Sequence, residues 1–525
     1  MQRGVSGSHD APEVGVAERH LRCFAAGLPA EAAGALSRAR SEGVPVAILD
    51  GLEGALPAAL SVDERWRAAV QADADRADRL LRVAQAVERA LAATAGLACA
   101  DSVLGPGWSA DFDVYARADA VGPASRALRQ AGAITLDELQ AGLRGTKAAT
   151  DPPQHFAVCE DGLVIGSAEL LTRLWTGGAA AAPAVARATG ADGLPRLVPQ
   201  DVARRRLAKL AAARRPTVRG LAELVVLLER GVPLPRPFAG GVLRRYAALE
   251  RALGGPGVVT AAAAGAPRRP GARALWVAAR ARAVRRETLR RFRRGHVSVA
   301  FCGLDGAGKT TQVAFLVASL ERGGVPAQAS WTRLGNKASG LVAGPARLAQ
   351  RLLPRGSHSY ETVREESGRR DPDRASDVDP PLTRRGVVGW SWALAVTIDY
   401  VVRARAARRR ARGHVLVLDR ALTDALVDLE DNYGVVLGLG LQRRLLDRWA
   451  PRPDLVFYLQ LSGSTAKARK DDVFTAADLE LRRGRYERLL KELDNVVALD
   501  AQRPRAELAA EALGHVGAAG RFTAG

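Results

Sequence analysis

The feature that most constrains the fold is a GxxxxGK[ST] motif at residues 303–310 (GLDGAGKT). Residues 297–302 before it are largely apolar, as in a buried strand, and residues 311–322 after it repeat apolar side chains at helical spacing. In such a strand–loop–helix unit the glycines let backbone N–H groups turn toward phosphate groups, and the helix N-terminus adds partial positive charge. The motif therefore predicts a phosphate-binding loop. The alternative is a glycine-rich turn that binds no ligand.

The loop also predicts roles for individual residues. Lys309 is expected to reach the terminal phosphates of ATP, and the Thr310 hydroxyl is expected to complete the coordination shell of Mg²⁺. The expected cofactors are therefore ATP and Mg²⁺. The residues expected to hold the nucleotide are Gly303, Gly306, Ala307, Gly308, Lys309, Thr310 and Thr311.

The C-terminal half, residues 296–525, is predicted to be an α/β domain. Strand patterns alternate there with helical patterns, which predicts a parallel sheet flanked by helices with the nucleotide at the carboxyl ends of the strands. At 525 residues and 47% apolar composition, the chain is expected to be globular and to hold more than one domain. The predicted strands are residues 297–302, 327–332, 414–418, 455–461 and 496–499.

The N-terminal half, residues 1–250, is expected to be a separate α+β domain. It contains two long helical patterns, at residues 64–95 and 202–230. The second pattern ends at Gly231 and Pro233, which are residue types that stop helices.

Residues 251–295 are expected to connect the two halves. Residues 254–271 are rich in Pro, Gly and Ala and predict a linker, and residues 272–294 predict an arginine-rich helix. Within the C-terminal half, the polar segment 354–385 shows no periodic pattern. It is expected to be either a disordered insertion or a mobile flap near the site.

The net charge of +21 at pH 7 raises the question of a polyanionic partner. Only seven of the 77 basic residues are lysine. The arginines cluster at residues 268–294 and 403–412, but neither run is interleaved with the aromatic residues expected of a single-strand stacking surface. We therefore expect a small anionic partner such as a nucleotide substrate, and no specific nucleic acid.

The cysteines and the apolar segments bear on localisation. The four cysteines form no CxxC pair and no zinc-ligand spacing, and the N-terminus lacks an apolar signal-peptide segment. A cytoplasmic protein is therefore expected. Residues 386–402 are apolar but short for a membrane span and contain Asp399, so we expect a buried helix and no membrane partner.

Further motifs accompany the loop in a fixed order. They are residues 301–312 (FCGLDGAGKTTQ), 331–333 (WTR), 415–420 (VLVLDR), 453–470 and 497–500 (VALD). This series resembles the thymidylate kinases over about residues 296–520. The resemblance implies an ATP-dependent kinase that phosphorylates a nucleoside monophosphate such as dTMP. A homodimer is one arrangement that stays open.

The resemblance also implies site residues, and their charges suit phosphoryl transfer, which needs positioning and positive charge. Asp419 is expected to hold Mg²⁺ through water, and Arg333 and Arg420 are expected to clamp the acceptor phosphate. The alternative for Asp419 and Arg420 is an ion pair at the strand end. Asp305 would accept a hydrogen bond from the 3′-hydroxyl of the acceptor sugar.

Gly306 bears on where the catalytic arginine comes from. Some thymidylate kinases have an arginine at this position, and those without it supply the charge from the lid. Catalysis is therefore expected to use Lys309, Arg420 and Arg469. The full set of lid candidates is Arg469, Lys470, Arg482, Arg483 and Arg485.

Departures from the family concern the acceptor. Leu334-Gly335 replaces Glu-Pro, Ala421 replaces the usual aromatic residue, and Asp399-Tyr400 stands where an Asp-Arg pair would meet the base. The alternatives are therefore a kinase of a non-nucleotide metabolite, or an ATP-binding regulatory protein. Asp424 and Asp428 lie four residues apart, and a solvated helix face is the expected explanation, with a substrate role as the alternative.

The N-terminal half contains a second, weaker motif at residues 107–114 (GWSADFDV). Strand alternation places Asp111 and Asp113 on one face, as a shared divalent metal requires. The pattern resembles the nucleotidyltransferases, with a helix at residues 122–130 and a strand at residues 156–160. Glu169 is the candidate third carboxylate. Because Trp108 splits the Gly-Ser of that signature, we expect a degenerate domain without transferase activity.

Overall fold

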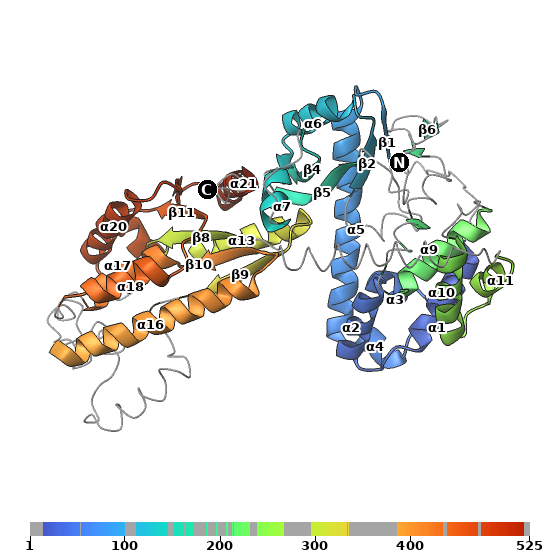
Figure 1. The fold of residues 1–525 in the computed structure, drawn as a ribbon, viewed down its shortest axis with the longest axis horizontal. Coiled ribbons are helices and arrows are strands. Elements are labelled where there is room, and N and C mark those ends of the chain that lie inside the picture. The colour runs from blue at the N-terminus through green and yellow to red at the C-terminus, as the bar shows by residue number, and fades with distance from the viewer. Residues whose placement is uncertain are drawn as a thin grey trace, which may run out of the picture. The chain divides into compact units, whose positions relative to one another are not determined.

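The computed structural model shows an α/β protein whose chain forms two compact units (Figure 1). The first unit contains residues 1–133, 151–158 and 165–292, and the second contains residues 134–150, 159–164 and 293–525. The residues that the structure describes are 14–52, 54–99, 112–144, 152–161, 163–171, 185–186, 196–197, 206–207, 210, 213, 215–231, 239–266, 296–332, 334, 386–433, 438–470 and 474–518.

The C-terminal half contains a five-stranded sheet in which every pairing is parallel, in the order β12-β11-β8-β10-β9. This confirms the predicted parallel sheet. The central strand leads directly into the glycine-rich loop. The strands are β8 (Val297–Gly303), β9 (Ala327–Trp331), β10 (Val415–Asp419), β11 (Leu455–Gln460) and β12 (Val496–Asp500), each close to its predicted range.

Strand β8 is buried along its whole length, because it lies between two other strands and under helices. Phe301 of β8 stacks on Phe457 of β11 with ring centroids 5.0 Å apart. At the start of the strand, the Asp454 carboxylate accepts hydrogen bonds from the backbone N–H and the hydroxyl of Ser298, both at 2.7 Å. These contacts fix the strand that carries the loop.

Helices accompany this sheet in sequence, as predicted. Helix α13 follows the loop and contacts β8, β9, β10 and α21, while α17 packs against α20 and α16 packs against α18. The helices are α13 (Lys309–Arg322), α16 (Gly386–Arg410), α17 (Leu422–Tyr433), α18 (Gly440–Trp449), α19 (Gly463–Arg469), α20 (Ala476–Leu490) and α21 (Arg505–Ala518).

Helix α16 contains the apolar segment that was expected to be a buried helix. Ala393, Asp399 and Tyr400 are buried, whereas Ile398 and Val402 are exposed. The helix is therefore only partly buried. No helix among the described residues is both long enough and apolar enough to cross a membrane.

The N-terminal half contains a mixed sheet in the order β3-β4-β5-β2-β1-β7-β6. Strands β1 and β2 pair antiparallel, whereas β2 and β5 pair parallel. The strands are β1 (Leu97–Cys99), β2 (Phe112–Ala116), β3 (Ile134–Thr135), β4 (His155–Glu160), β5 (Leu163–Leu171), β6 (Val185–Ala186) and β7 (Arg196–Leu197).

One apolar core in this half joins the long helix α5 to the sheet. Val83 and Val87 of α5 pack with Val114 of β2, Phe156 of β4 and Leu128 of α6. The helices are α1 (Val14–Ala26), α2 (Ala32–Glu42), α3 (Val46–Asp50), α4 (Ala58–Val62), α5 (Glu64–Leu91), α6 (Val121–Gln130), α7 (Asp137–Arg144), α9 (Val218–Glu229), α10 (Ala239–Ala252) and α11 (Val258–Ala264).

Two expectations for this half are wrong in part. A single helix over residues 202–230 is interrupted, because α9 begins only at Val218, where Thr217 Oγ1 accepts a hydrogen bond from Gly220 N as an N-cap. The expected irregular linker contains α11, and Val259 of that helix is fully buried in a core with α9 and α10. The expected arginine-rich helix and the polar segment 354–385 lie outside the described residues.

The aromatic stack yields a stability prediction. Phe457 is fully buried, so Phe457→Ala removes its packing and leaves a cavity, which typically costs about 3–5 kcal/mol. The control Leu481→Ala changes a side chain that is 68% exposed and should alter stability by less than about 0.5 kcal/mol. Urea unfolding of both variants checks this. Equal losses would contradict the assignment of Phe457 to the core.

Candidate functional site

The glycine-rich loop adopts backbone conformations that its glycines make accessible. Gly303 has φ +138° and Gly306 has φ +88°. A Cβ on Gly303 would lie 2.7 Å from Leu459 O, and one on Gly306 would lie 3.0 Å from Ala466 O. Larger residues at these positions would therefore be strained and crowded. The strand–loop–helix geometry predicted from the motif is confirmed.

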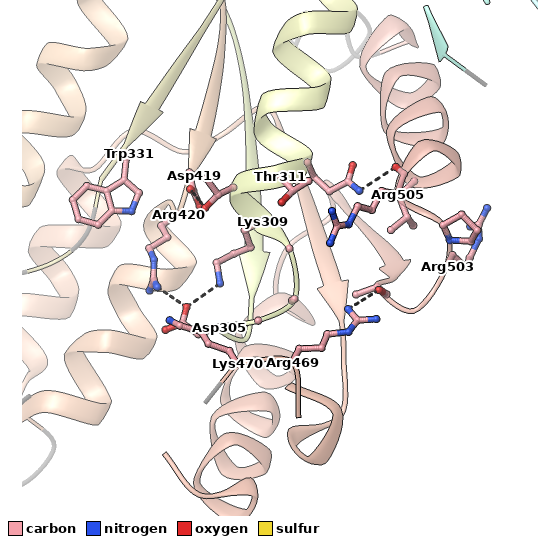
Figure 2. A pocket seen from close by; sticks show the side chains of 18 residues that line it. Asp305, Lys309, Thr311, Trp331, Asp419, Arg420, Arg469, Lys470, Arg503 and Arg505 are labelled. Atoms are coloured by element: carbon pink, nitrogen blue, oxygen red, sulfur yellow. Dashed lines mark hydrogen bonds and ion pairs between the residues drawn. The ribbon is translucent and has the colours of Figure 1, made fainter. Parts of the chain in front are cut away.

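Lys309 is buried at the first position of α13 and points back into the loop (Figure 2). Its Nζ donates to Gly303 O at 2.8 Å, to Leu304 O at 2.9 Å and to Asp305 Oδ1 at 3.2 Å. An ammonium group has three donors, and all three find acceptors within the loop. These three bonds hold the ammonium group within the loop.

Asp305 joins Lys309 to Arg420, which follows β10. Arg420 Nη2 donates to Asp305 Oδ1 at 2.5 Å. Although burial alone would raise it, the positive charges of Lys309 and Arg420 hold the pKa of Asp305 well below its ordinary value. Arg420 also has φ +75°, a conformation that costs free energy in a non-glycine residue and marks many functional sites.

Asp419 and Thr310 meet across the sheet edge, 109 residues apart in sequence. Thr310 Oγ1 donates to Asp419 Oδ2 at 2.6 Å. Both are oxygen ligands of the kind that Mg²⁺ prefers, so the pair fits the ion. The described residues hold no cluster of three His, Cys, Asp or Glu side chains, so phosphate oxygens and water would supply the other ligands. The alternative of an Asp419–Arg420 ion pair is wrong, because each of the two pairs elsewhere.

A cavity of about 700 Å³ opens beside the loop (Figure 2). It is lined by Asp305, Gly306, Ala307, Gly308, Lys309, Thr310, Thr311, Gln312, Trp331, Asp419, Arg420, Arg469, Lys470, Ala501, Arg503, Pro504, Arg505 and Leu508. The predicted loop residues after Gly303 therefore line one cavity. The segment after β12 was missed, although the rule that ligands bind beyond the carboxyl ends of parallel strands points to it.

The lid candidates separate into two groups. Arg469 and Lys470 line the cavity, and Arg469 Nη1 donates to Ala501 O at 3.0 Å. The remaining three arginines pair with acidic side chains of α17 and α20 and do not line it. These three are Arg482, Arg483 and Arg485.

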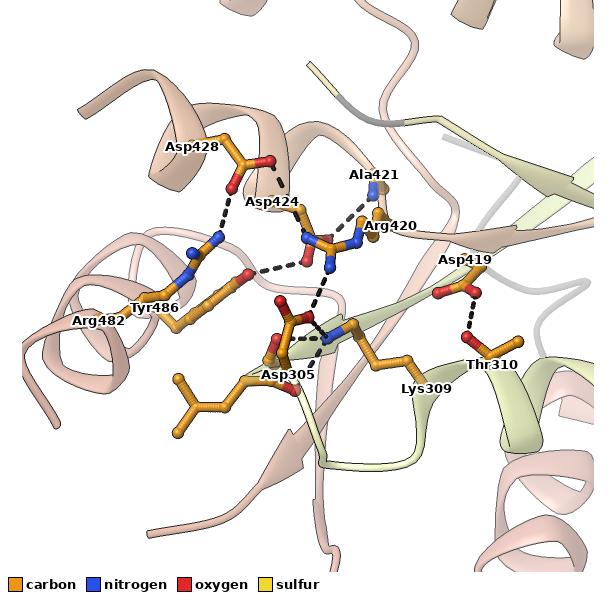
Figure 3. Close-up of polar contacts among 12 residues, drawn as sticks. Asp305, Lys309, Thr310, Asp419, Arg420, Ala421, Asp424, Asp428, Arg482 and Tyr486 are labelled. Carbon is orange, nitrogen blue, oxygen red and sulfur yellow. Dashed lines mark hydrogen bonds and ion pairs between the residues drawn. The ribbon is translucent and has the colours of Figure 1, made fainter. Parts of the chain in front are cut away.

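Asp424 and Asp428 do not face solvent, so the expectation of a solvated helix face is wrong (Figure 3). Asp424 accepts from Ala421 N at 3.0 Å and from the Tyr486 hydroxyl at 2.8 Å, and Asp428 pairs with Arg482. Burial raises the pKa of Asp424 above its ordinary value, and the charge of Lys309 opposes that shift. Spacing along a helix cannot reveal such partners, because they come from α20.

Of the other acceptor-side positions, Asp399 and Tyr400 do not line the cavity. Asp399 accepts from Arg403 Nε at 2.7 Å within α16, and Tyr400 is buried. Arg333 and Gly335 lie outside the described residues.

The N-terminal motif is described only in part, because Trp108 and Asp111 lie outside the described residues. Asp113 of β2 and Glu169 of β5 are register partners on neighbouring parallel strands, so their side chains share one face. His155 Nε2 lies 3.2 Å from Glu169 Oε1. The register thus places Glu169, the candidate third carboxylate, beside Asp113. Loss of transferase activity stays a prediction.

The lowered pKa of Asp305 predicts how stability depends on pH. A carboxylate with a depressed folded-state pKa stabilises the protein above its unfolded-state pKa of about 3.9, and that contribution is lost as the pH falls. Asp305→Asn should therefore lower the melting temperature at neutral pH, and the difference from the native protein should shrink below about pH 4. Melting curves across pH check this, with the surface substitution Asp494→Asn as the control. A difference that stays constant in acid would contradict it.

Comparison with known proteins adds no family to this geometry. Neither a protein-family model nor a curated protein matches the chain.

Proposed function

We propose that the C-terminal half is an ATP-dependent phosphotransferase similar to thymidylate kinase. The observation that carries the proposal is the convergence of three sequence segments at one sheet edge. Lys309 and Thr310 lie at the start of α13 after β8, Asp419 ends β10 and Arg420 follows it, and Arg469 ends α19. All five residues line one cavity. Phosphoryl transfer needs this combination of cations and a magnesium-compatible carboxylate.

The proposed reaction transfers the γ-phosphoryl group of ATP to an oxygen of a phosphorylated acceptor. The acceptor oxygen forms a bond to the γ-phosphorus while the bond to the β–γ bridging oxygen breaks, which leaves ADP. Lys309 neutralises charge on the transferred group, Arg420 holds the acceptor phosphate, and Arg469 and Lys470 add positive charge from the lid. Bound Mg²⁺ would screen charge on the phosphate oxygens, and Thr310 and Asp419 would hold it.

Two acceptor classes follow from the residues. The resemblance favours a nucleoside monophosphate such as dTMP, with Asp305 accepting from its sugar hydroxyl. A non-nucleotide phosphorylated metabolite is the second candidate, because neither Asp399, which bonds within its own helix, nor the buried Tyr400 lines the cavity. A purely regulatory ATP-binding protein would show no acceptor-stimulated turnover.

An acceptor screen tests the proposal. Purified full-length protein is incubated with ATP, Mg²⁺ and each nucleoside monophosphate or sugar phosphate in turn, and ADP release is measured. Stimulation by nucleoside monophosphates supports the first acceptor class, and stimulation by sugar phosphates alone supports the second. Absence of turnover with every acceptor would leave the regulatory role.

The first prediction for this activity concerns Lys309. Lys309→Met keeps the aliphatic stem but removes the charge, so kcat should fall by about 100-fold or more, since such electrostatic contributions are worth about 3 kcal/mol. The exposed Lys491→Met is the matched control and should keep native turnover. Steady-state kinetics and melting curves of both variants provide the measurement. Native turnover in a folded Lys309→Met protein would refute the proposed role.

The second concerns Asp419. Asp419→Asn removes the carboxylate beside Thr310, so the Mg²⁺ concentration for half-maximal activity should rise roughly tenfold or more. Asp500, the last residue of β12, provides the matched control, because Asp500→Asn alters an exposed strand-end carboxylate that caps only Gln502 N. Magnesium titrations at saturating ATP distinguish the two. An unchanged titration for Asp419→Asn would remove this residue from the metal site.

A further inference from the structure

Asp428 lies between two buried guanidinium groups (Figure 3). Arg482 Nη2 is hydrogen-bonded to Asp428 Oδ1. On the other side, Arg420 Nη1 lies 4.0 Å from Asp428 Oδ2, which is too far for a hydrogen bond. One carboxylate is thus bonded to one arginine and near a second.

Arg420 is satisfied at one end only. Its Nη2 bonds to Asp305, whereas its buried Nη1 has no hydrogen-bond acceptor among the described residues. A buried donor without an acceptor costs free energy, so a hydrogen bond from Nη1 to an oxygen atom would be favourable. Asp428 and an incoming phosphate are therefore competing acceptors for the same donor.

We propose that Arg482 is a positioning residue for Arg420. By bonding to Asp428 Oδ1, Arg482 fixes that carboxylate so that its Oδ2 stays 4.0 Å from Arg420 Nη1, beyond hydrogen-bond distance. Arg420 therefore stays bonded to Asp305 and keeps Nη1 for an oxygen of the acceptor phosphate. This inference rests on the proposed function in one respect, namely that Arg420 binds the acceptor.

The surroundings of Arg482 suit such a role. Its Nε lies 3.5 Å from Asp431 Oδ2, and its guanidinium lies 5.9 Å from the centre of the Phe474 ring. One turn later on α20, the Tyr486 hydroxyl donates to Asp424 at 2.8 Å. Polar contacts of Arg482 and Tyr486 therefore fix this helix to α17, and a rigid arginine fork can hold Asp428 in place.

The same helix is connected to α19, which ends at the lid candidate Arg469. Gly463 N, at the start of α19, donates to Glu480 Oε2 of α20 at 3.0 Å, and α19 ends at Arg469 in the cavity wall. Because α20 contacts both α19 and α17, its position links the nucleotide side of the site to the acceptor clamp.

Three variants of the full-length protein test the inference. Arg482→Met removes the guanidinium group that bonds to Asp428 but keeps a long, flexible side chain. The double variant Arg482→Met/Asp428→Asn also removes the negative charge of residue 428. It therefore leaves no unpaired buried carboxylate that could destabilise the fold. Arg482→Lys keeps a positive charge beside Asp428 and serves as the conservative control.

Two measurements apply to each variant, the crystal structure and the affinity for inorganic phosphate by calorimetry. In Arg482→Met we expect Arg420 to bond to Asp428, and phosphate binding to weaken about tenfold, as for loss of one charged hydrogen bond. The double variant and Arg482→Lys should keep Arg420 on Asp305 and bind phosphate within about threefold of the native protein.

The inference fails if Arg420 stays on Asp305 in Arg482→Met, or if the double variant binds phosphate as weakly as the single one. Neither measurement requires turnover. An inactive protein with the expected pattern would therefore disprove the proposed kinase activity alone, whereas an active protein without the pattern would disprove the positioning role alone.

Discussion

The site depends on the partly buried Asp305 carboxylate, which bonds to Lys309 of its own loop and to Arg420, the residue after another strand. Lys309 and Arg420 are 111 residues apart in sequence, and two cations held close together repel each other. A carboxylate between them offsets this repulsion. Asp305 supplies that carboxylate, and its lowered pKa keeps it charged. The arrangement places two positive charges in the wall of the cavity.

The sheet makes this bridge geometrically accessible. Strand β8 is central, and its neighbour β10 pairs with it so that Asp419 lies opposite Phe301, two residues before the loop begins its turn at Gly303. The ends of both strands therefore meet at one edge. The positive φ of Arg420 then turns its side chain toward Asp305, and the packed core under Phe301 and Phe457 supports that strain.

A second layer of charge lies behind the first. Asp424 and Asp428 on α17 bond to Tyr486 and Arg482 on α20, so α20 is fixed by polar contacts that have little access to water. Buried charges of this kind contribute less to stability than to a defined geometry, provided each is paired. In the N-terminal half, the register of β2 and β5 also brings together two residues that are distant in sequence, Asp113 and Glu169.

The sequence by itself determined the five parallel strands and the glycine-rich loop between β8 and α13. Apolar runs, glycine spacing and helix stops are local properties, so they can be read without the tertiary structure. It predicted a linker where α11 forms, because the burial of Val259 in a core with α9 and α10 depends on residues distant in sequence. It also misassigned Asp424 and Asp428, and it missed Ala501, Arg503, Pro504 and Arg505 in the cavity wall. These features depend on partners far away in the chain, since Tyr486 lies 62 residues from Asp424. Only the tertiary structure decides which distant groups meet, because burial and charge pairing are set by packing and not by spacing along one element.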